Sequence, residues 1–494
     1  WLGRLSGGPL RVLLTARLMD WPGDLGLAAL RLDTFSPEES RALLEKTSEV
    51  SETLEVWDAL AERLGHLPLA LDLAGRYLKR HPRKRVAEYV EELDEVLAHR
   101  SMRRWRADLG NPTGHDLDLM ATFALSWEEV EDPAAQRLFQ MAGYCAPNEP
   151  IPCDLLERAA DLNQDACDEA LLALTGLGLL TRPPSSGGEG DVGEEVGVII
   201  HPLLAEYART LSSLDIEKGR AEEGLAALAD TLATMTGEAL DTGLPERFLP
   251  LRPHARAVAS RAEEVGLEAA GTLWNNLGSH LRMMADYAGA QAAFERALRI
   301  DEAVYGPDHP AVAIRINNLG LVLHDQGDLA GAQAAYERAL RIDEAVYGPD
   351  HPAVAIRINN LGLVLHDQGD LAGAQAAYER ALRIDEAVYG PDHPDVATDV
   401  NNLGLVLQAQ GDLAGARAAY ERALRIWQEA YGDEHPQVAT AYNNLGLVLQ
   451  DQGDLAEARA AYERALRIFE KFLPPDHPHI ETVRGNLESL RSQE

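Results

Sequence analysis

A block of 42 residues, 300–341, is followed at once by a second copy with the same letters, 342–383. The tetrapeptide Asn-Asn-Leu-Gly marks the same register five times, starting at Asn275, Asn317, Asn359, Asn401 and Asn443. A fixed period of this length is the signature of a solenoid, in which each unit stacks on its neighbours and no single globular core forms. The second half of the chain is therefore predicted to be an array, and binding is a better first hypothesis for it than catalysis.

Each repeat is predicted to be a pair of antiparallel helices. An apolar stripe at helical spacing runs from Val312 to Leu323, a Gly-Asp pair interrupts it, and a second stripe with small alanines follows. The sequence Gly-Pro-Asp-His-Pro then restarts the unit, with Asp350 or His351 as helix cap and Pro352 in the first turn.

Five residues match the spacing of the tetratricopeptide repeat (TPR) consensus: Leu319, Gly320, Ala332, Tyr336 and Ala339. With its 42-residue period, its Asn-Asn-Leu-Gly sequence and its Gly-Pro-Asp-His-Pro loop, the array most closely resembles the repeats of kinesin light chains. It departs from the consensus at Ile316, where a large aromatic residue is usual. The resemblance implies an α-solenoid that binds a protein or peptide, with five repeats over 267–476 and a capping helix at 477–494.

In TPR proteins the exposed side of each first helix lines a concave groove, so the resemblance places a partner there. Asparagine offers both a donor and an acceptor, and a ladder of Asn pairs can satisfy the main chain of an extended peptide. The predicted contact residues are Asn275, Asn317, Asn318, Leu321, His324, Asn359, Asn360, Leu363, His366, Asn401, Asn402, Asn443 and Asn444. The alternative is that one Asn of each pair bridges neighbouring helices and serves the fold.

The periodic histidines, from His309 to His477, do not form a metal site. Equivalent positions in stacked repeats lie at least about 8–10 Å apart, whereas a zinc–nitrogen bond is about 2 Å long. These histidines are therefore interpreted as loop and cap residues. The three cysteines have no CxxC spacing, which favours structural thiols in a reducing cytoplasm.

The chain is strongly acidic, with 80 acidic and 45 basic residues and a net charge of −35. Such a chain is repelled by phosphate backbones and anionic membranes, so nucleic acid and membrane are poor default partners. The acidity is built into the array, because each identical repeat carries six acidic residues against three arginines. Two interpretations stay open: a solvated surface that keeps the solenoid soluble, or a site for a basic partner.

The first 210 residues contain short segments in a particular order. A buried-strand pattern at 11–15 precedes Arg17, and Gly-His-Leu-Pro-Leu-Ala-Leu at 65–71 separates two helices. Short strands at 178–182 and 196–201 flank a loop rich in Gly, Ser and Pro. Helices followed by strand, loop and strand are the pattern of a winged helix.

In that order the segments resemble the C-terminal part of the NB-ARC (STAND-type) signalling ATPases. The resemblance implies that Arg17 reaches the γ-phosphate, Pro68 packs on adenine, and His201 contacts the β-phosphate of ADP. Pro202 stands where the family has Asp. Alternatively, Arg17 and His201 are strand-end residues and Pro68 marks a helix start. The implied domains are 1–50 (remnant of the α/β nucleotide-binding domain), 51–112 (helical), 113–212 (winged helix) and 213–266 (helical linker), within a mainly α protein.

Neither a G-x-x-x-x-G-K-[ST] loop nor an acid-tipped apolar strand occurs in the sequence. These features hold phosphates and magnesium, so this chain is expected to have no enzymatic activity and no cofactor of its own. The start at Trp1 is interpreted as a truncation, with ADP or ATP and Mg²⁺ belonging to a longer protein.

The leading hypothesis is the regulatory half of a signal-transduction ATPase switch, whose TPRs bind a protein or peptide ligand. Its other partners are the missing N-terminal domains in cis and, in the longer protein, further copies of itself. One alternative is a constitutive TPR scaffold with a decayed ATPase. The other is a DNA-binding regulator using the winged helix, which is opposed by acidic residues such as Asp154, Glu157 and Asp165.

Overall fold

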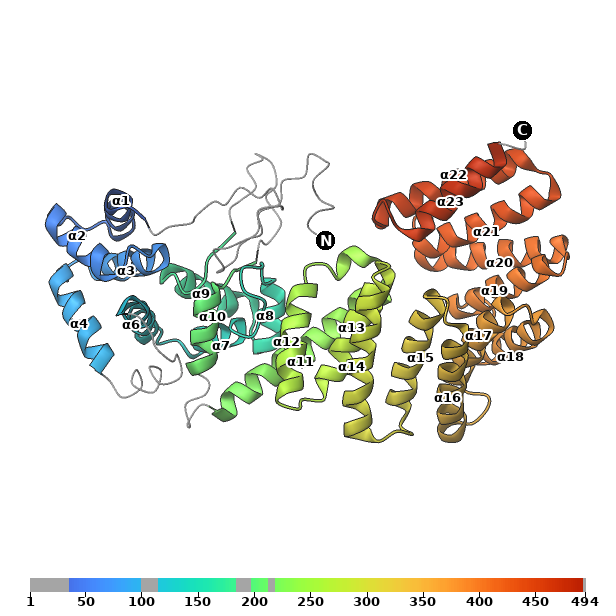
Figure 1. Ribbon diagram of the computed structural model, residues 1–494, viewed down its shortest axis with the longest axis horizontal. Coiled ribbons are helices and arrows are strands. Elements are labelled where there is room, and N and C mark those ends of the chain that lie inside the picture. The colour runs from blue at the N-terminus through green and yellow to red at the C-terminus, as the bar shows by residue number, and fades with distance from the viewer. Residues whose placement is uncertain (1–34, 99–113, 184–196, 212–217, 492–494) are drawn as a thin grey trace, which may run out of the picture. The chain divides into compact units, whose positions relative to one another are not determined.

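The computed structural model describes residues 35–98, 114–183, 197–211 and 218–491 (Figure 1). These residues form two compact units, one ending at Leu125 and the other beginning at Ser126. Within the described ranges regular structure is helical apart from two isolated β-bridges, which confirms the predicted mainly α class. Among the described helices, none is long and apolar enough to span a membrane.

The first unit is a small helical cluster. Its helices are α1 (Pro37–Ser48), α2 (Leu54–Arg63), α3 (Pro68–Arg80), α4 (Val86–Ala98) and most of α6 (Gly114–Glu128). Ser36 and Glu39 form a capping box at the start of α1, as the Ser-Pro-Glu-Glu sequence predicts. Trp57, Leu44 and Leu71 are fully buried and form part of its core.

The second unit begins with α7 (Pro133–Ala142), α8 (Cys153–Ala160), α9 (Gln164–Gly176) and α10 (Pro202–Leu211). The two segments expected to be strands do pair, since Thr181 and Ile199 form an antiparallel bridge. A third segment joins them through the bridge between Ile151 and Val198. Residues 184–196 between the bridged segments lie outside the described ranges, and the assignment of this region as a winged helix stays a prediction.

A long helix leads from this region to the array. It is α11 (Lys218–Asp241), and it is followed by η3 (Pro245–Arg247) and α12 (Arg252–Glu264). The buried His254 of α12 accepts a hydrogen bond at Nδ1 from Ala146 N (3.2 Å), and its Nε2 lies 2.9 Å from Pro150 O. Burial lowers the pKa of His254, so a neutral imidazole fastens α12 to the loop before α8.

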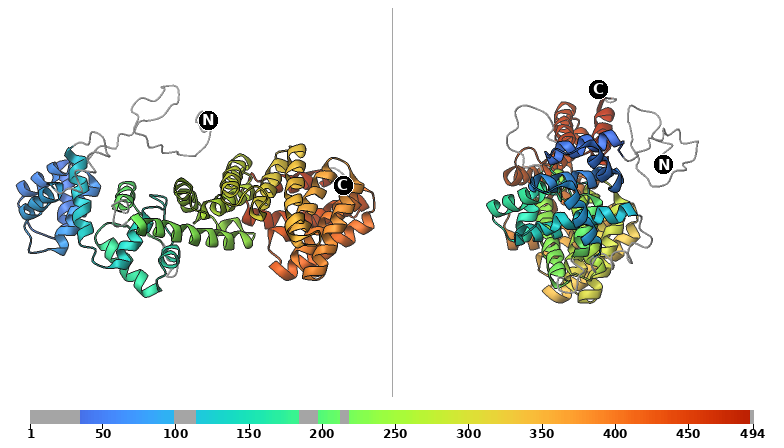
Figure 2. Two further views of the ribbon diagram at one scale, coloured as in Figure 1. Left: turned by 90° about the horizontal axis from the view of Figure 1, so that it is seen from below. Right: turned by 90° about the vertical axis from the view of Figure 1, so that its left-hand side faces the viewer.

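Five helical hairpins and one further helix form the array, stacked in chain order (Figure 1, Figure 2). They are α13 (Ala269–Met283), α14 (Tyr287–Tyr305), α15 (Pro310–Asp325), α16 (Leu329–Tyr347), α17 (Pro352–Asp367), α18 (Leu371–Tyr389), α19 (Pro394–Ala409), α20 (Leu413–Tyr431), α21 (Pro436–Gln452), α22 (Leu455–Phe472) and α23 (Pro478–Arg491). In α23, Arg484, Glu488 and Arg491 are exposed, as expected for a capping helix.

Close approach inside each hairpin explains the glycine of the Asn-Asn-Leu-Gly sequence. A Cβ atom on Gly362 would lie 2.7 Å from Tyr378 Cε1, closer than carbon atoms pack. The same distance is 2.6 Å at Gly320 and Tyr336. The glycine therefore allows the fully buried tyrosine of the second helix to lie against the first helix.

The periodic histidines cap the first helices, as predicted. His351 Nδ1 accepts a hydrogen bond from Ala353 N (3.1 Å), and its ring stacks on Tyr347 with centroids 4.4 Å apart. Pro352 follows at the first helical position. The same His-Pro cap begins four more helices, at His309, His393, His435 and His477.

Two of these histidines also fasten the end of the array to its beginning. His435 Nε2 lies 3.0 Å from Thr242 O, and His477 Nε2 lies 3.0 Å from Met283 O. In each imidazole Nδ1 accepts and Nε2 donates, which is the pattern of a neutral ring. Burial lowers the pKa of both histidines and favours that form. The array thus curves until its last repeats contact the helices at its start.

Candidate functional site

A groove of about 590 Å³ lies across the first helices of three successive repeats, α15, α17 and α19. It is lined by Pro310, Ile314, Asn317, Asn318, Leu321, Asp343, Tyr347, His351, Ala353, Ile356, Arg357, Asn359, Asn360, Asp385, Asp395, Thr398 and Asp399. Five of the predicted contact residues are in this set: Asn317, Asn318, Leu321, Asn359 and Asn360. The groove therefore lies on the side of the first helices that the sequence indicated.

The asparagines on the floor of the groove form a ladder of side-chain amides. Asn360 Nδ2 donates to Asn317 Oδ1 (2.8 Å), and Asn318 Nδ2 donates to Asn275 Oδ1 (2.8 Å). The same bond recurs from Asn402 to Asn359, from Asn444 to Asn401 and from Asn486 to Asn443. At the N-terminal end, Asn276 Nδ2 donates to Ala233 O and Thr236 Oγ1, both at 3.0 Å.

Each Asn pair therefore bridges neighbouring repeats, which is the alternative that the sequence left open. A carboxamide has two N–H donors and two acceptor lone pairs, so one bond of each kind leaves capacity for a ligand. The amides of Asn317 and Asn360 are buried but line the groove. Their contact with a partner stays a prediction.

The remaining predicted contact residues are engaged inside the array. His324 Nε2 lies 2.8 Å from Asp367 Oδ2, and His366 Nδ1 lies 3.0 Å from the other oxygen of the same carboxylate. Leu363 packs against the apolar cluster around Tyr378, as groove-lining Leu321 does against the cluster around Tyr336. None of His324, His366 and Leu363 is among the residues that line the groove.

Sequence analysis missed a buried ion pair that joins consecutive hairpins. Arg315 Nε donates to Asp301 Oδ2 (2.7 Å), and Arg357 Nε donates to Asp343 Oδ2 (2.9 Å). All four side chains are nearly inaccessible to solvent. Burial raises the pKa of Asp343 and the Arg357 guanidinium opposes that shift. In the charge count, Asp301 was one of the six acids of the repeat and had no assigned partner. The signal for the ion pair was the spacing of 14 residues between Asp301 and Arg315, on consecutive helices.

The third position of this kind has a different composition. Asp385 is retained, but Asp399 stands where the two earlier repeats have arginine. Asp385 and Asp399 are 4% and 3% exposed, and both line the groove. The replacement of arginine by Asp399 is visible in the sequence alone. Its consequence, two buried carboxyl groups in contact, becomes clear only in the folded structure.

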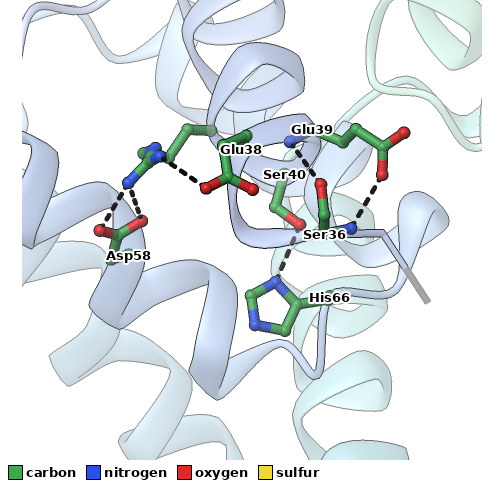
Figure 3. A network of polar contacts seen from close by, with 7 residues as sticks. Ser36, Glu38, Glu39, Ser40, Asp58 and His66 are labelled. Atoms are coloured by element: carbon green, nitrogen blue, oxygen red, sulfur yellow. Dashed lines mark hydrogen bonds and ion pairs between the residues drawn. The ribbon is translucent and has the colours of Figure 1, made fainter.

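The 65–71 segment of the first unit comprises a short connection at 65–67 and the first residues of α3. Gly65 and His66 are in the left-handed region, with φ of 65° and 53°. Figure 3 shows His66 beside Ser40 of α1, with His66 Nδ1 2.9 Å from Ser40 Oγ. Pro68 occupies the first turn of α3. That position agrees with the helix-start interpretation, and contact of Pro68 with adenine stays a prediction.

His201 lies at the start of α10, directly after the bridged segment. Its Nδ1 accepts a hydrogen bond from Leu203 N (3.2 Å), the same cap that the array histidines make. Burial lowers its pKa. The contact of His201 with a phosphate stays a prediction. Arg17 lies outside the described residues.

Comparison with known proteins places the array in a family. Residues 269–345, 313–387, 355–400 and 398–471 match the tetratricopeptide repeat model, so these hairpins are TPRs. No match was found among curated proteins.

Similarity to several solved structures was also found. BtubC (BKLC) from P. vanneervenii is 24% identical (TM-score 0.35; 49% of this chain and 91% of that one). A Pyrococcus horikoshii STAND protein with a tetratricopeptide repeat sensor is 14% identical (TM-score 0.49; 94% of this chain and 64% of that one). Nearly identical TPR-like repeats of a Podosopora anserina kinesin light chain are 19% identical (TM-score 0.32; 43% and 97%).

Proposed function

We propose that the chain is the partner-binding and regulatory part of a nucleotide-dependent signalling switch, whose TPR array binds an extended peptide segment of another protein. The observation that carries the binding half is the groove across α15, α17 and α19. Stacked TPRs are interaction modules that present one long concave surface. The groove supplies the two kinds of contact that an extended peptide needs.

The first kind is apolar. Ile314 and Ile356, which occupy the same position of consecutive repeats, are 43% and 46% exposed and line the groove. Exposed aliphatic side chains in a concave surface offer apolar contacts to the side chains of an extended ligand. The second kind is polar, because the Asn ladder below them retains free donors and acceptors for main-chain groups.

Peptide selection on the whole chain tests the binding half. A peptide is selected from a random library, and its affinity is compared for the native chain, the double variant Ile314→Asp/Ile356→Asp and the control Val346→Asp. Val346 is 51% exposed and does not line the groove. The double variant should bind at least about tenfold more weakly, or about 1.4 kcal/mol, while the control binds like the native chain. Equal affinity for all three proteins would remove the groove from the proposal.

The regulatory half rests on the order of the 65–71 turn, His201 and the array. In a switch, the ligand must bind one nucleotide state more tightly than the other. The proposal applies to a form of the protein that also has a phosphate-binding loop. In that form, the selected peptide should bind with different affinity in the presence of ADP and of ATP with Mg²⁺. An unchanged affinity would favour the constitutive scaffold.

A further inference from the structure

One joint, the contact between the second helix of a repeat and the first helix of the next, lacks a cation that the two preceding joints have. At two successive joints a buried Asp pairs with a buried Arg, first Asp301 with Arg315 and then Asp343 with Arg357. At the next joint Asp385 remains, while the arginine is replaced by Asp399. One joint further on, both charges are gone, because buried Trp427 and Ala441 occupy these positions. The joint between α18 and α19 therefore keeps carboxyl groups without a guanidinium.

The two carboxyl groups are buried side by side with unused hydrogen-bonding capacity. Asp385 Oδ1 and Asp399 Oδ2 are inaccessible to solvent and have no hydrogen-bond partner among the described residues. Two adjacent buried carboxylates cannot both stay ionised at low cost, so the pair shares a proton. Burial is the main cause that raises the pKa of both groups. The next cause is the negative charge of Asp395 for Asp385, and that of Asp385 for Asp399.

The surroundings of the pair are acidic. Asp395 on α19 and Glu386 on α18 add negative potential, and His393 is the basic side chain that opposes the shift at Asp385. Both of these acids have a basic neighbour, since Arg422 donates to Glu386 Oε1 (2.8 Å) and His393 Nδ1 lies 3.6 Å from Asp395 Oδ2. The arginine of the preceding joint, Arg357, is held by Asp343 at 2.9 Å. Asp385 and Asp399 line the groove, so the buried carboxyl pair lies in the wall of the surface where a peptide is proposed to lie.

We propose that Asp385 and Asp399 form a receptor for the guanidinium group of an arginine in the bound peptide. This inference rests on the proposed peptide-binding function and adds the class of side chain that the groove selects. The ligand's guanidinium occupies the place that Arg315 and Arg357 fill from within the chain at the two preceding joints. The recognition is thus an intermolecular version of an ion pair that the same scaffold already makes twice.

Guanidinium fits this site better than the other cations. A planar guanidinium carries five donors and matches carboxylates in a bidentate way, whereas lysine presents a single strongly hydrated charge. A Ca²⁺ ion takes six to eight oxygen ligands. Across the described residues, no group of three or more His, Cys, Asp and Glu side chains is arranged to hold a metal ion.

Binding has a proton balance that can be measured. The incoming guanidinium is always charged, and its pairing with both carboxylates ionises the one that holds the shared proton. That proton is released to solvent, so binding of one arginine at neutral pH releases up to about one proton. Calorimetry in buffers of different ionisation enthalpy reads this release directly.

The test uses three synthetic decapeptide libraries that share random flanks and differ at one fixed central residue: arginine, its neutral isostere citrulline, or lysine. Retention by the whole chain is compared with retention by Asp399→Arg, which gives α19 the residue that α15 and α17 already carry. Asp399→Asn is a second variant with nearly unchanged shape. The control is Asp350→Arg, which makes the same charge change at an exposed loop residue outside the groove.

The native chain and Asp350→Arg should retain the arginine library at least about fivefold better than the citrulline library, with lysine between them. Asp399→Arg and Asp399→Asn should lose that preference. Equal retention of arginine and citrulline, lost in Ile314→Asp/Ile356→Asp, overturns the arginine receptor and leaves the peptide groove in place. An equal loss of preference in Asp350→Arg also overturns it, because general charge then explains the result. Retention of none of the libraries overturns both proposals.

Discussion

The joint between α16 and α17 and the joint between α18 and α19 have the same second helix and the same loop, letter for letter, yet opposite electrostatics. In the first, Arg357 neutralises Asp343; in the second, Asp399 faces Asp385. Three of the positions that differ line the groove, where Ala353, Ile356 and Arg357 become Asp395, Thr398 and Asp399. The other three differences lie outside it, where Ile358, His366 and Asp367 become Val400, Gln408 and Ala409. Most of the residues that form the helices and loop of the repeat are thus the same in both copies, while the charge and polarity of three groove-lining positions differ.

Removal of the retained Asp should have opposite effects at the two joints. Asp343→Ala leaves the Arg357 guanidinium buried without its partner, which costs about 3–5 kcal/mol. Asp385→Ala removes one of two repelling carboxyl groups, and the free energy of unfolding should change little or rise. Urea unfolding of the two variants measures the contrast. Equal destabilisation would show that the joints are electrostatically alike.

Scaffold positions inside the hairpins should instead respond alike in both repeats. Gly362→Ala and Gly404→Ala each place a Cβ atom 2.7 Å from the tyrosine of the second helix. Such overpacking costs about 1–3 kcal/mol, and the two variants should differ from each other by less than the error of a denaturation curve. A large difference would mean that the copies do not pack in the same way.

The Asn ladder is a second test of shared scaffold. Asn360→Ala and Asn402→Ala leave Asn317 Oδ1 and Asn359 Oδ1 without their donors. A buried unsatisfied acceptor costs about 1–3 kcal/mol. Thermal unfolding should show similar losses for both. If peptide affinity falls while the melting temperature is unchanged, the amides serve the ligand more than the fold.

The carboxyl pair should make stability depend on pH. The folded-state pKa values of the pair, about 6 and about 9, lie above the usual 3.8 of an Asp in the unfolded chain. The folded state therefore holds more protons at this pair, and the pair's contribution to stability is greatest at low pH and is lost as pH rises through these values. The slope is at most about 1.4 kcal/mol per pH unit for each proton. Melting curves from pH 5 to 9 should fall more steeply for the native chain than for Asp399→Asn, and parallel curves would contradict the shared proton.

The smallest expected effect compares two caps. His351→Ala removes a helix cap, which costs about 1 kcal/mol. His435→Ala removes the same cap and also the hydrogen bond to Thr242 O, which adds about 0.5–1.5 kcal/mol. Chemical denaturation of both variants checks the order. The reverse order would mean that closure of the array contributes nothing to stability.

Much of the fold follows from the sequence because it is local and periodic. The hairpins depend on helical spacing from Val312 to Leu323, and the His-Pro caps depend on adjacent residues. The same periodicity placed Asn317, Asn318 and Leu321 on the groove side.

Contacts between repeats were harder to predict. The bond from Asn360 to Asn317 and the ion pair of Asp343 with Arg357 depend on how far one hairpin turns against the next. The count of charges left open whether the acids of the repeat are solvated or bind a basic partner, and did not identify the ion pair of Asp343, because a partner 14 residues away lies close only after the helices pack. The burial of Asp385 could not be predicted from the sequence, because it follows from the packing that also buries the equivalent Asp301 and Asp343.

The most direct test of the peptide groove is site-specific photocrosslinking. A benzophenone side chain is introduced at position 356 or at position 346 of the whole chain, and each protein is irradiated with a peptide selected on the native chain. Ile356 lies in the groove and Val346 does not, although both are about half exposed. A crosslink from position 356 and none from position 346 is the predicted result. A crosslink from position 346 alone would contradict the proposal that the groove across α15, α17 and α19 is the binding surface.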